Sequence, residues 1–203
     1  VGSEMCIRDR LGLNEQGTRY SSPVQVPGTT WKQASSPRST WTATKTDGTL
    51  WVWGDNAKGS LGLNQAGWPT RTHQSSPTQL PGTNWYRVGG NDASSAGVKT
   101  DGTLWTWGTG GAYAHNNTTT LVSPKQVGSD TTWSTIAPNT NYGQLATKTD
   151  GTLWAWGGNT SGELAQNDRT SRSSPVQLPG TEWTGNVEIS GRSVFAIQED
   201  HTP

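Results

Sequence analysis

The sequence has little charge and no excess of either sign. Of its 203 residues, 15 are Lys or Arg and 15 are Asp or Glu, so the formal net charge is zero. A protein that binds nucleic acid or an anionic membrane by general electrostatic attraction needs a surplus of Lys and Arg. The balance therefore excludes that class of binding, and we predict no direct nucleic-acid contact.

Three further absences narrow the function. No run approaches the roughly 20 apolar residues that a membrane-spanning helix needs, so no membrane insertion is expected. Residues 1–10 lack the continuous apolar stretch of a signal peptide. Cys6 is the single cysteine, so no disulfide forms within the chain and cysteine usage identifies no redox compartment.

Tryptophan is abundant where aliphatic residues are scarce. Hydrophobic residues make up only 29% of the chain, yet 12 of them are Trp. Each Trp can bury about 150–250 Å². The core is therefore predicted to be aromatic.

The Trp residues belong to an internal repeat. The heptapeptide KTDGTLW occurs at 45–51, 99–105 and 148–154. A second motif, of the form S-P-x-Q followed by a Trp, alternates with it at 21–31, 75–85, 122–133 and 173–183. Ten Trp stand in register and are predicted to form the core: Trp31, Trp51, Trp53, Trp85, Trp105, Trp107, Trp133, Trp154, Trp156 and Trp183.

Each repeat has the pattern of short antiparallel strands. Thr-rich and Trp-rich runs favour strands, and an Asp-Gly pair between two such runs predicts a hairpin. The hairpin loop has either two residues or three with a bulge. In each W-x-W the two indoles face one side of the sheet and the neighbouring apolar residues face the other, so both faces need a neighbour. Pro in the S-P-x-Q segments predicts an outer strand. The turn residues are Asp47, Gly48, Asp101, Gly102, Asp150 and Gly151.

These motifs resemble the regulator of chromosome condensation repeat, whose family forms seven-bladed β-propellers. The matching pattern stands as DGTLWVWGDNAKGSLGLN at 47–64, followed by Pro77 and Leu80, and recurs at 150–167, followed by Pro175 and Leu178. The middle copy departs after Gly108, where TGGAYAHNN lacks the Leu-Gly step. The resemblance covers about 11–201. It implies an all-β fold with about four of seven blades in an incomplete ring.

The repeats divide the chain as follows. Residues 1–10 match nothing and are predicted to be a foreign or disordered leader, and residues 11–203 are propeller repeats. Within these we expect a partial blade at 11–44, blades at about 45–98, 99–147 and 148–197, and a truncated hairpin at 198–203.

No residue pattern predicts chemistry. The histidines occupy non-equivalent places, and neither a nucleophile elbow nor a metal-binding loop pattern is present. We therefore expect no catalytic residue, metal or cofactor. The W-x-W pairs could form a stacking platform, but their register favours packing between blades.

The loops that depart from the repeat are the candidate binding surface. They occupy the same point in each repeat and should emerge on one face, and Trp, Tyr and Arg dominate interface energetics. Trp68 could instead pack beneath its own loop, whereas Trp41 is expected in the core. The candidate partner-binding residues are Arg19, Tyr20, Trp68, Arg71, His73, Tyr113, His115, Arg169 and Arg172.

Three functions follow from these observations. The first is a non-catalytic protein-binding scaffold of bacterial or viral type, secreted or surface-exposed, which the resemblance and the uncharged, Ser/Thr/Asn-rich composition favour. The second is the namesake activity that the resemblance implies, guanine-nucleotide exchange on a small GTPase with chromatin association. The third is glycan binding by a surface or phage-fibre module.

Overall fold

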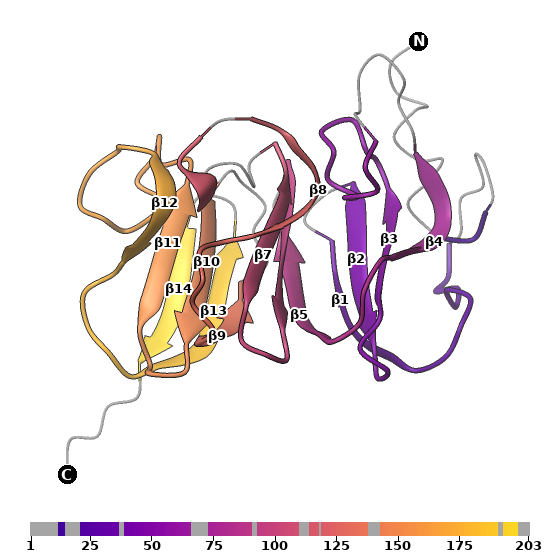
Figure 1. Cartoon of the computed structure of the whole chain (residues 1–203), viewed down its shortest axis with the longest axis horizontal. Coiled ribbons are helices and arrows are strands. Elements are labelled where there is room, and N and C mark those ends of the chain that lie inside the picture. The colour runs from indigo at the N-terminus through magenta and orange to yellow at the C-terminus, as the bar shows by residue number, and fades with distance from the viewer. Residues whose placement is uncertain are drawn as a thin grey trace.

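A computed structural model describes residues 12–14, 21–36, 39–65, 73–90, 93–109, 114–117, 119–137, 143–190 and 193–198. Within these residues the strands are antiparallel and form four consecutive sheets (Figure 1), and a short 3-10 turn lies at 114–115. None of the described residues forms a helix long and apolar enough to cross a bilayer.

Three of the sheets have four strands each, in chain order. The first contains β1 (Trp31–Ser35), β2 (Thr40–Lys45), β3 (Leu50–Gly54) and β4 (Gln74–Leu80). The second contains β5 (Trp85–Gly90), β6 (Ser94–Lys99), β7 (Leu104–Gly108) and β8 (Leu121–Gln126). The third contains β9 (Trp133–Ile136), β10 (Gly143–Lys148), β11 (Leu153–Gly157) and β12 (Arg172–Gln177). The fourth pairs β13 (Trp183–Ser190) with β14 (Ser193–Gln198).

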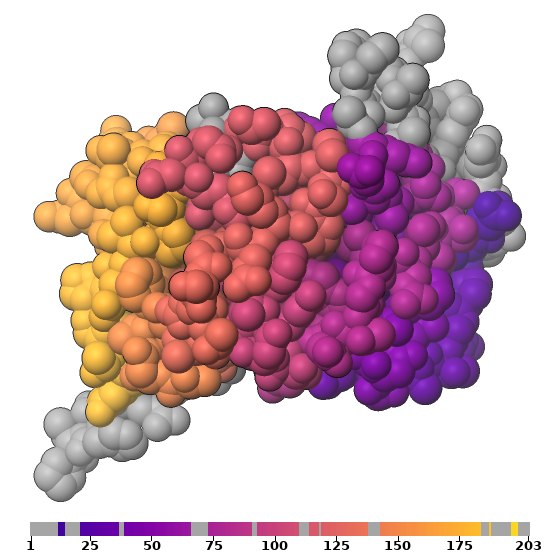
Figure 2. All heavy atoms as spheres, viewed as in Figure 1, coloured from indigo at the N-terminus to yellow at the C-terminus, as the bar shows by residue number. Residues whose placement is uncertain are grey.

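The sheets follow one another as bands along the molecule (Figure 2). Contacts between neighbouring sheets join β1 to β5, β5 to β9 and β9 to β13, so the first strand of each sheet is the inner one. The strands that carry the S-P-x-Q segments, β4, β8 and β12, are outer edges. This agrees with the prediction from Pro, because an edge strand needs no ladder donor on one side.

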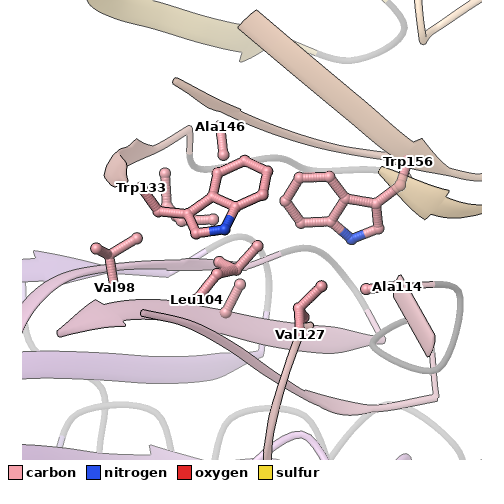
Figure 3. Close-up of a cluster of buried hydrophobic side chains, with 9 residues drawn as sticks. Val98, Leu104, Ala114, Val127, Trp133, Ala146 and Trp156 are labelled. Atoms are coloured by element: carbon pink, nitrogen blue, oxygen red, sulfur yellow. The ribbon is translucent and has the colours of Figure 1, made fainter. Parts of the chain in front are cut away.

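The indoles pack between sheets. Trp85 and Trp107 of the second sheet form one buried cluster with Leu50, Val52 and Leu80 of the first. The same arrangement recurs one sheet later, where Trp133 and Trp156 lie against the second sheet (Figure 3). Each sheet thus presents an aromatic face to the aliphatic face of the sheet before it, which accounts for the two apolar faces of every W-x-W strand.

The Asp-Gly hairpins have three-residue loops. In the first, Thr46, Asp47 and Gly48 connect β2 to β3, Lys45 N donates to Thr49 O at 3.0 Å, and Gly48 has a φ of 78°. A left-handed third residue is typical of this hairpin and favours Gly. The structure therefore decides between the two loops that the sequence allowed.

The sheets are out of phase with the repeats counted from the sequence. The first sheet begins at Trp31 and ends at Leu80, whereas the expected blade runs from 45 to 98. The KTDGTLW heptapeptide marks the middle hairpin of a sheet and not its boundary. The all-β propeller-type fold is confirmed, while the boundary between residues 10 and 11 lies outside the described residues.

Candidate functional site

The two ends of the sheets differ in what they carry. The turn end holds the Asp-Gly hairpins and the connections between sheets, such as 81–84. The opposite end holds the connections from the third to the fourth strand of the first three sheets (top of Figure 1). We call their described residues the loop face: 55–65, 73, 109, 114–117, 119–120 and 158–171. The expectation that these loops share one face follows directly from the strand order.

A buried asparagine anchors the loop in two of the three sheets. Asn56 is fully buried, and its Oδ1 accepts a hydrogen bond from Leu61 N at 3.0 Å. Asn159 is equally buried, accepts from Leu164 N at 2.9 Å, and donates to Thr170 O at 3.2 Å. In each loop the Asn side chain accepts a hydrogen bond from a buried backbone amide. We expect this bond to hold the loop stem in one conformation although the stem lies outside any strand.

The first and second loops each donate a backbone hydrogen bond to the outer strand of the next sheet. Asn64 N donates to Val122 O in β8 at 2.8 Å, and Asn116 N donates to Ser173 O in β12 at 2.8 Å. Both asparagines have positive φ, 58° and 60°, a conformation that Asn tolerates better than most residues. The loop face is therefore a continuous surface built by neighbouring sheets.

His115 of the middle loop points into the structure. Its Nε2 lies 3.0 Å from Oγ1 of Thr106, a residue that is 1% exposed. Burial, together with the positive charge of Lys125, lowers the pKa of His115. His115, a candidate binding residue, is half-buried and engaged in this hydrogen bond.

Two arginines lie at the end of the third loop: Arg169 in the loop and Arg172 at the start of β12. Arg172 bonds to Asp168 Oδ2 at 2.6 Å and to Thr170 O at 2.8 Å. The backbone hydrogen bond from Thr170, followed by the bond from Arg172, lowers the pKa of Asp168. Arg169 is exposed and lines a shallow hollow with Gly162, Ala165, Asn167 and Asp168. Of the two arginines, Arg169 is the exposed one.

The remaining candidate residues divide into two groups. His73 Nδ1 lies 3.4 Å from Asp55 Oδ1 at the edge of the first loop, with both side chains partly exposed. The others lie outside the described residues: Arg19, Tyr20, Trp68, Arg71 and Tyr113.

The turn end carries a repeated polar unit. In the first sheet Trp51 Nε1 donates to Thr49 Oγ1 at 2.9 Å, and Thr49 Oγ1 donates to Asp47 Oδ1 at 2.7 Å. These bonds recur at Asp101 and Asp150. The hydrogen bond from the Thr side chain is the main cause that lowers the pKa of all three carboxyls. They are turn residues, each bound to its own hairpin.

In each of the first three sheets, the Lys of KTDGTLW lies over two indole rings. Lys45 Nζ lies 4.7 Å from the Trp31 ring centroid and 4.1 Å from that of Trp51. Lys99 and Lys148 repeat this arrangement in the next two sheets. The KTDGTLW heptapeptide is therefore one structural unit in which cation–π contacts hold the two outermost indoles together.

Sequence reasoning missed a second variable position. The residue after the first Trp of each sheet is Lys32, Tyr86 or Ser134, on the inner strands β1, β5 and β9. Variation next to a Trp that recurs in every sheet was the signal available in the sequence.

No group of three or more His, Cys, Asp or Glu that could hold a metal ion occurs within the described ranges. Two polar contacts of the loop face that involve a carboxylate are that of Asp55 with His73 and that of Asp168 with Arg172. The loop face therefore combines stems held by buried hydrogen bonds with exposed side chains that differ from sheet to sheet.

Comparison with known proteins supports this architecture. Residues 150–196 match the family model of the regulator of chromosome condensation (RCC1) repeat. No curated protein matches the sequence. Human WBSCR16 is similar in structure, with a TM-score of 0.71 and 19% identity over 83% of this chain and 46% of that one.

Two yeast structures are similar as well. Prp20p of Saccharomyces cerevisiae, studied for its binding to Gsp1p and histones, has a TM-score of 0.69 and 15% identity over 85% of this chain and 45% of its own. Yeast RCC1 (Prp20) in its complex with Kap60 has a TM-score of 0.67 and 15% identity, over 85% of this chain and 43% of that one. The present chain spans less than half the length of these structures. Residues 150–196 thus carry a regulator of chromosome condensation repeat, and the chain has the fold of part of a β-propeller.

Proposed function

We propose that the protein is a non-catalytic scaffold that binds another protein through its loop face. The observation that carries this proposal is the contrast between stem and tip of each loop. Asn56 and Asn159 hold two stems through the same buried hydrogen bond, while the exposed tips differ in sequence from sheet to sheet. Binding function is commonly placed on variable loops that a rigid scaffold positions.

Arg169 is the described residue best suited to contact a partner. Its side chain is exposed, and it makes no hydrogen bond or ion pair with the described part of the chain. The neighbouring Arg172 is already bound to Asp168 and so shapes the loop. Arg is enriched at binding hot spots because a planar guanidinium makes several directed hydrogen bonds. We include Trp68 and Arg71 in the proposed surface on their sequence alone.

Gsp1p and histones are the first partners to try. The fold is similar to that of Prp20p, which has been studied for binding to both. Guanine-nucleotide exchange remains a second candidate function only through this likeness in fold. Glycan binding, the third, would use the same loop face.

A pair of surface variants tests the proposal. The loop-face variant R169A/N117A changes two exposed side chains at the tips, and the turn-end variant T29A/E182A changes two exposed side chains at the other end of the sheets. Immobilised protein is exposed to Gsp1p, to histones and to a glycan array, and nucleotide release from Gsp1p is followed separately.

We expect a bound protein to be lost with the loop-face variant and kept with the turn-end variant. Loss with the turn-end variant alone would place binding on the other end and contradict the proposal. Binding of glycans without any protein would favour the lectin function, and accelerated nucleotide release would favour the exchange factor.

A further inference from the structure

A β-bulge occurs at the same place in the first three sheets. Trp31 pairs with Lys45 and Gln33 with Thr44, so Lys32 is an extra residue on β1. In β5 the pairing skips Tyr86 in the same way. Bulges bend a strand and re-aim a side chain, and they are frequent beside functional sites. Two neighbouring inner strands therefore each present one re-aimed residue.

The inner strands hold these two residues close together. The Gln33 side chain donates to Val88 O at 3.1 Å and accepts from Val88 N at 3.3 Å. This pair of bonds ties β1 to β5 one residue beyond the bulge in β1. Because the backbone of β5 is fixed against a β1 side chain, Lys32 and Tyr86 keep one relative position without needing a ligand.

Lys32, Tyr86 and Arg87 form what we call the cationic cluster. Lys32 Nζ lies 4.8 Å from the centroid of the Tyr86 ring, and Arg87 Cζ lies 4.9 Å from it. The two charges are thus within about 10 Å of one another, roughly the Debye length at 0.1 M salt, so their repulsion is only partly screened.

No carboxylate of the described chain neutralises this cluster. Two cations elsewhere in the described chain do pair with a carboxylate: Lys148 with Asp130, and Arg172 with Asp168. By contrast, no ion pair to Lys32 or Arg87 occurs within the part of the chain that the structure describes.

Arg87 also has hydrogen-bonding capacity that the chain does not use. Its Nε is buried and has no hydrogen-bond partner within the described residues. The Tyr86 ring attracts the guanidinium charge but does not accept its in-plane N–H groups. Buried donors in proteins are almost always bonded to something. An anion supplied from outside would offset the repulsion between the two cations.

We propose that the cationic cluster binds an oxyanion, a phosphate or carboxylate group of a ligand. Guanidinium and ammonium groups form strong charge-assisted hydrogen bonds with both kinds of oxygen. The site lies on inner strands near the turn end, away from the loop face, so it is independent of the proposed partner surface. The loop variants of the previous section leave it intact.

Titration with inorganic phosphate at constant ionic strength tests the site. Binding is followed by NMR through the backbone amides of the full 203-residue chain. We expect saturable shifts at residues 32–33 and 86–88. The variants K32M and R87M keep the aliphatic stems, which limits loss of packing, and each should weaken binding about tenfold. The matched control is K125M, which removes an exposed Lys from β8 and should bind as the unchanged protein does.

A second arm distinguishes the source of the oxyanion. A capped pentaglutamate peptide is titrated beside phosphate. Tighter binding of the peptide assigns the site to carboxylates of an acidic protein segment, and tighter binding of phosphate assigns it to a free or esterified phosphate. Absence of saturable binding of either probe overturns the proposal, as does equal weakening by K125M and R87M. Melting temperatures show that the variants are folded.

Discussion

The indole Nε1 of Trp107 in the second sheet donates a 2.8 Å hydrogen bond to the backbone oxygen of Ser60 in the loop of the first. The same oxygen accepts from Ser95 Oγ at 2.9 Å, so one carbonyl of one sheet joins two residues of the next. Trp156 is the corresponding indole of the third sheet, and its buried Nε1 has no partner among the described residues. Within the described residues, the hydrogen bond from the indole to the preceding sheet is therefore present at Trp107 and not at Trp156.

This difference predicts unequal costs for the same substitution. Trp107 and Trp156 are both 0% exposed, so W107F and W156F remove similar packing. W107F also removes a hydrogen bond, whereas W156F removes a donor that has no partner within the described ranges. We expect W107F to lower the free energy of unfolding by about 1–3 kcal/mol more than W156F does. Urea denaturation followed by circular dichroism measures both, and equal losses would contradict the inequality.

The Asp-Gly turns predict a sharp glycine requirement. Gly102 has a φ of 77°, and a Cβ there would overlap the carbonyl oxygen of Thr131 in the connection to the third sheet. Gly128 has a φ of 60°, and a Cβ added there would meet nothing within 4 Å, so G128A suffers only backbone strain. We expect G128A to cost about 1 kcal/mol and G102A about 3 kcal/mol or more. Similar melting temperatures for the two variants would refute the clash.

Asp130 and Lys148 predict a pH-dependent contribution to stability. Their side chains meet at 2.5 Å, and hydrogen bonds from Lys148 and Thr132 lower the pKa of Asp130 to about 2. Because the folded pKa lies below the unfolded one, this stability is present above pH about 4 and is lost as the pH falls toward 2.

The isosteric variant D130N isolates that contribution. The pair is partly exposed, so we expect a loss of only about 1 kcal/mol at pH 7 and no difference from the unchanged protein near pH 2. Denaturant unfolding at several pH values measures it, with E182Q as a control of equal charge change at an exposed site. A D130N deficit that stayed constant down to pH 2 would rule out the ionised pair as its cause.

We expect the conformation of the third loop to depend on the hydrogen bond that the Asn159 side chain accepts. Alanine at this position leaves the buried amide of Leu164 without its acceptor, at a cost of about 2–3 kcal/mol. Hydrogen exchange at Leu164 should accelerate as well. The neighbouring T160A changes an exposed side chain and should alter neither quantity. Unchanged exchange in N159A would show that the loop stem does not depend on this side chain.

Much of the fold could be predicted from the sequence because the repeat is regular. Ten Trp in register and three Asp-Gly pairs predicted strands, hairpins and an aromatic layer between sheets, and the propeller-type fold is confirmed. The phase of the sheets could not be predicted, since a repeat has no boundary of its own. The sheet begins at Trp31 because that strand pairs with the strand that ends at Lys45, whereas the S-P-x-Q segment before Trp31 forms no strand.

The candidate site was less accessible to sequence reasoning. In the sequence, His115, Arg169 and Arg172 were equivalent candidates because all three belong to the loop regions. In the structure His115 bonds to a buried Thr and Arg172 bonds to Asp168, while Arg169 is exposed. The cationic cluster was missed because Lys32 and Tyr86 are 54 positions apart and meet only across two sheets.

The sequence by itself determined what is local and periodic: strand alternation, the turn residues, and the indole that recurs at each step. These depend on neighbouring residues, whose geometry the chain fixes directly. Only the tertiary structure decided which polar atoms find partners, because a hydrogen bond such as that from Trp107 to Ser60 joins residues of different sheets. The corresponding indole of Trp156 has no such partner among the described residues, although both sheets share the residue.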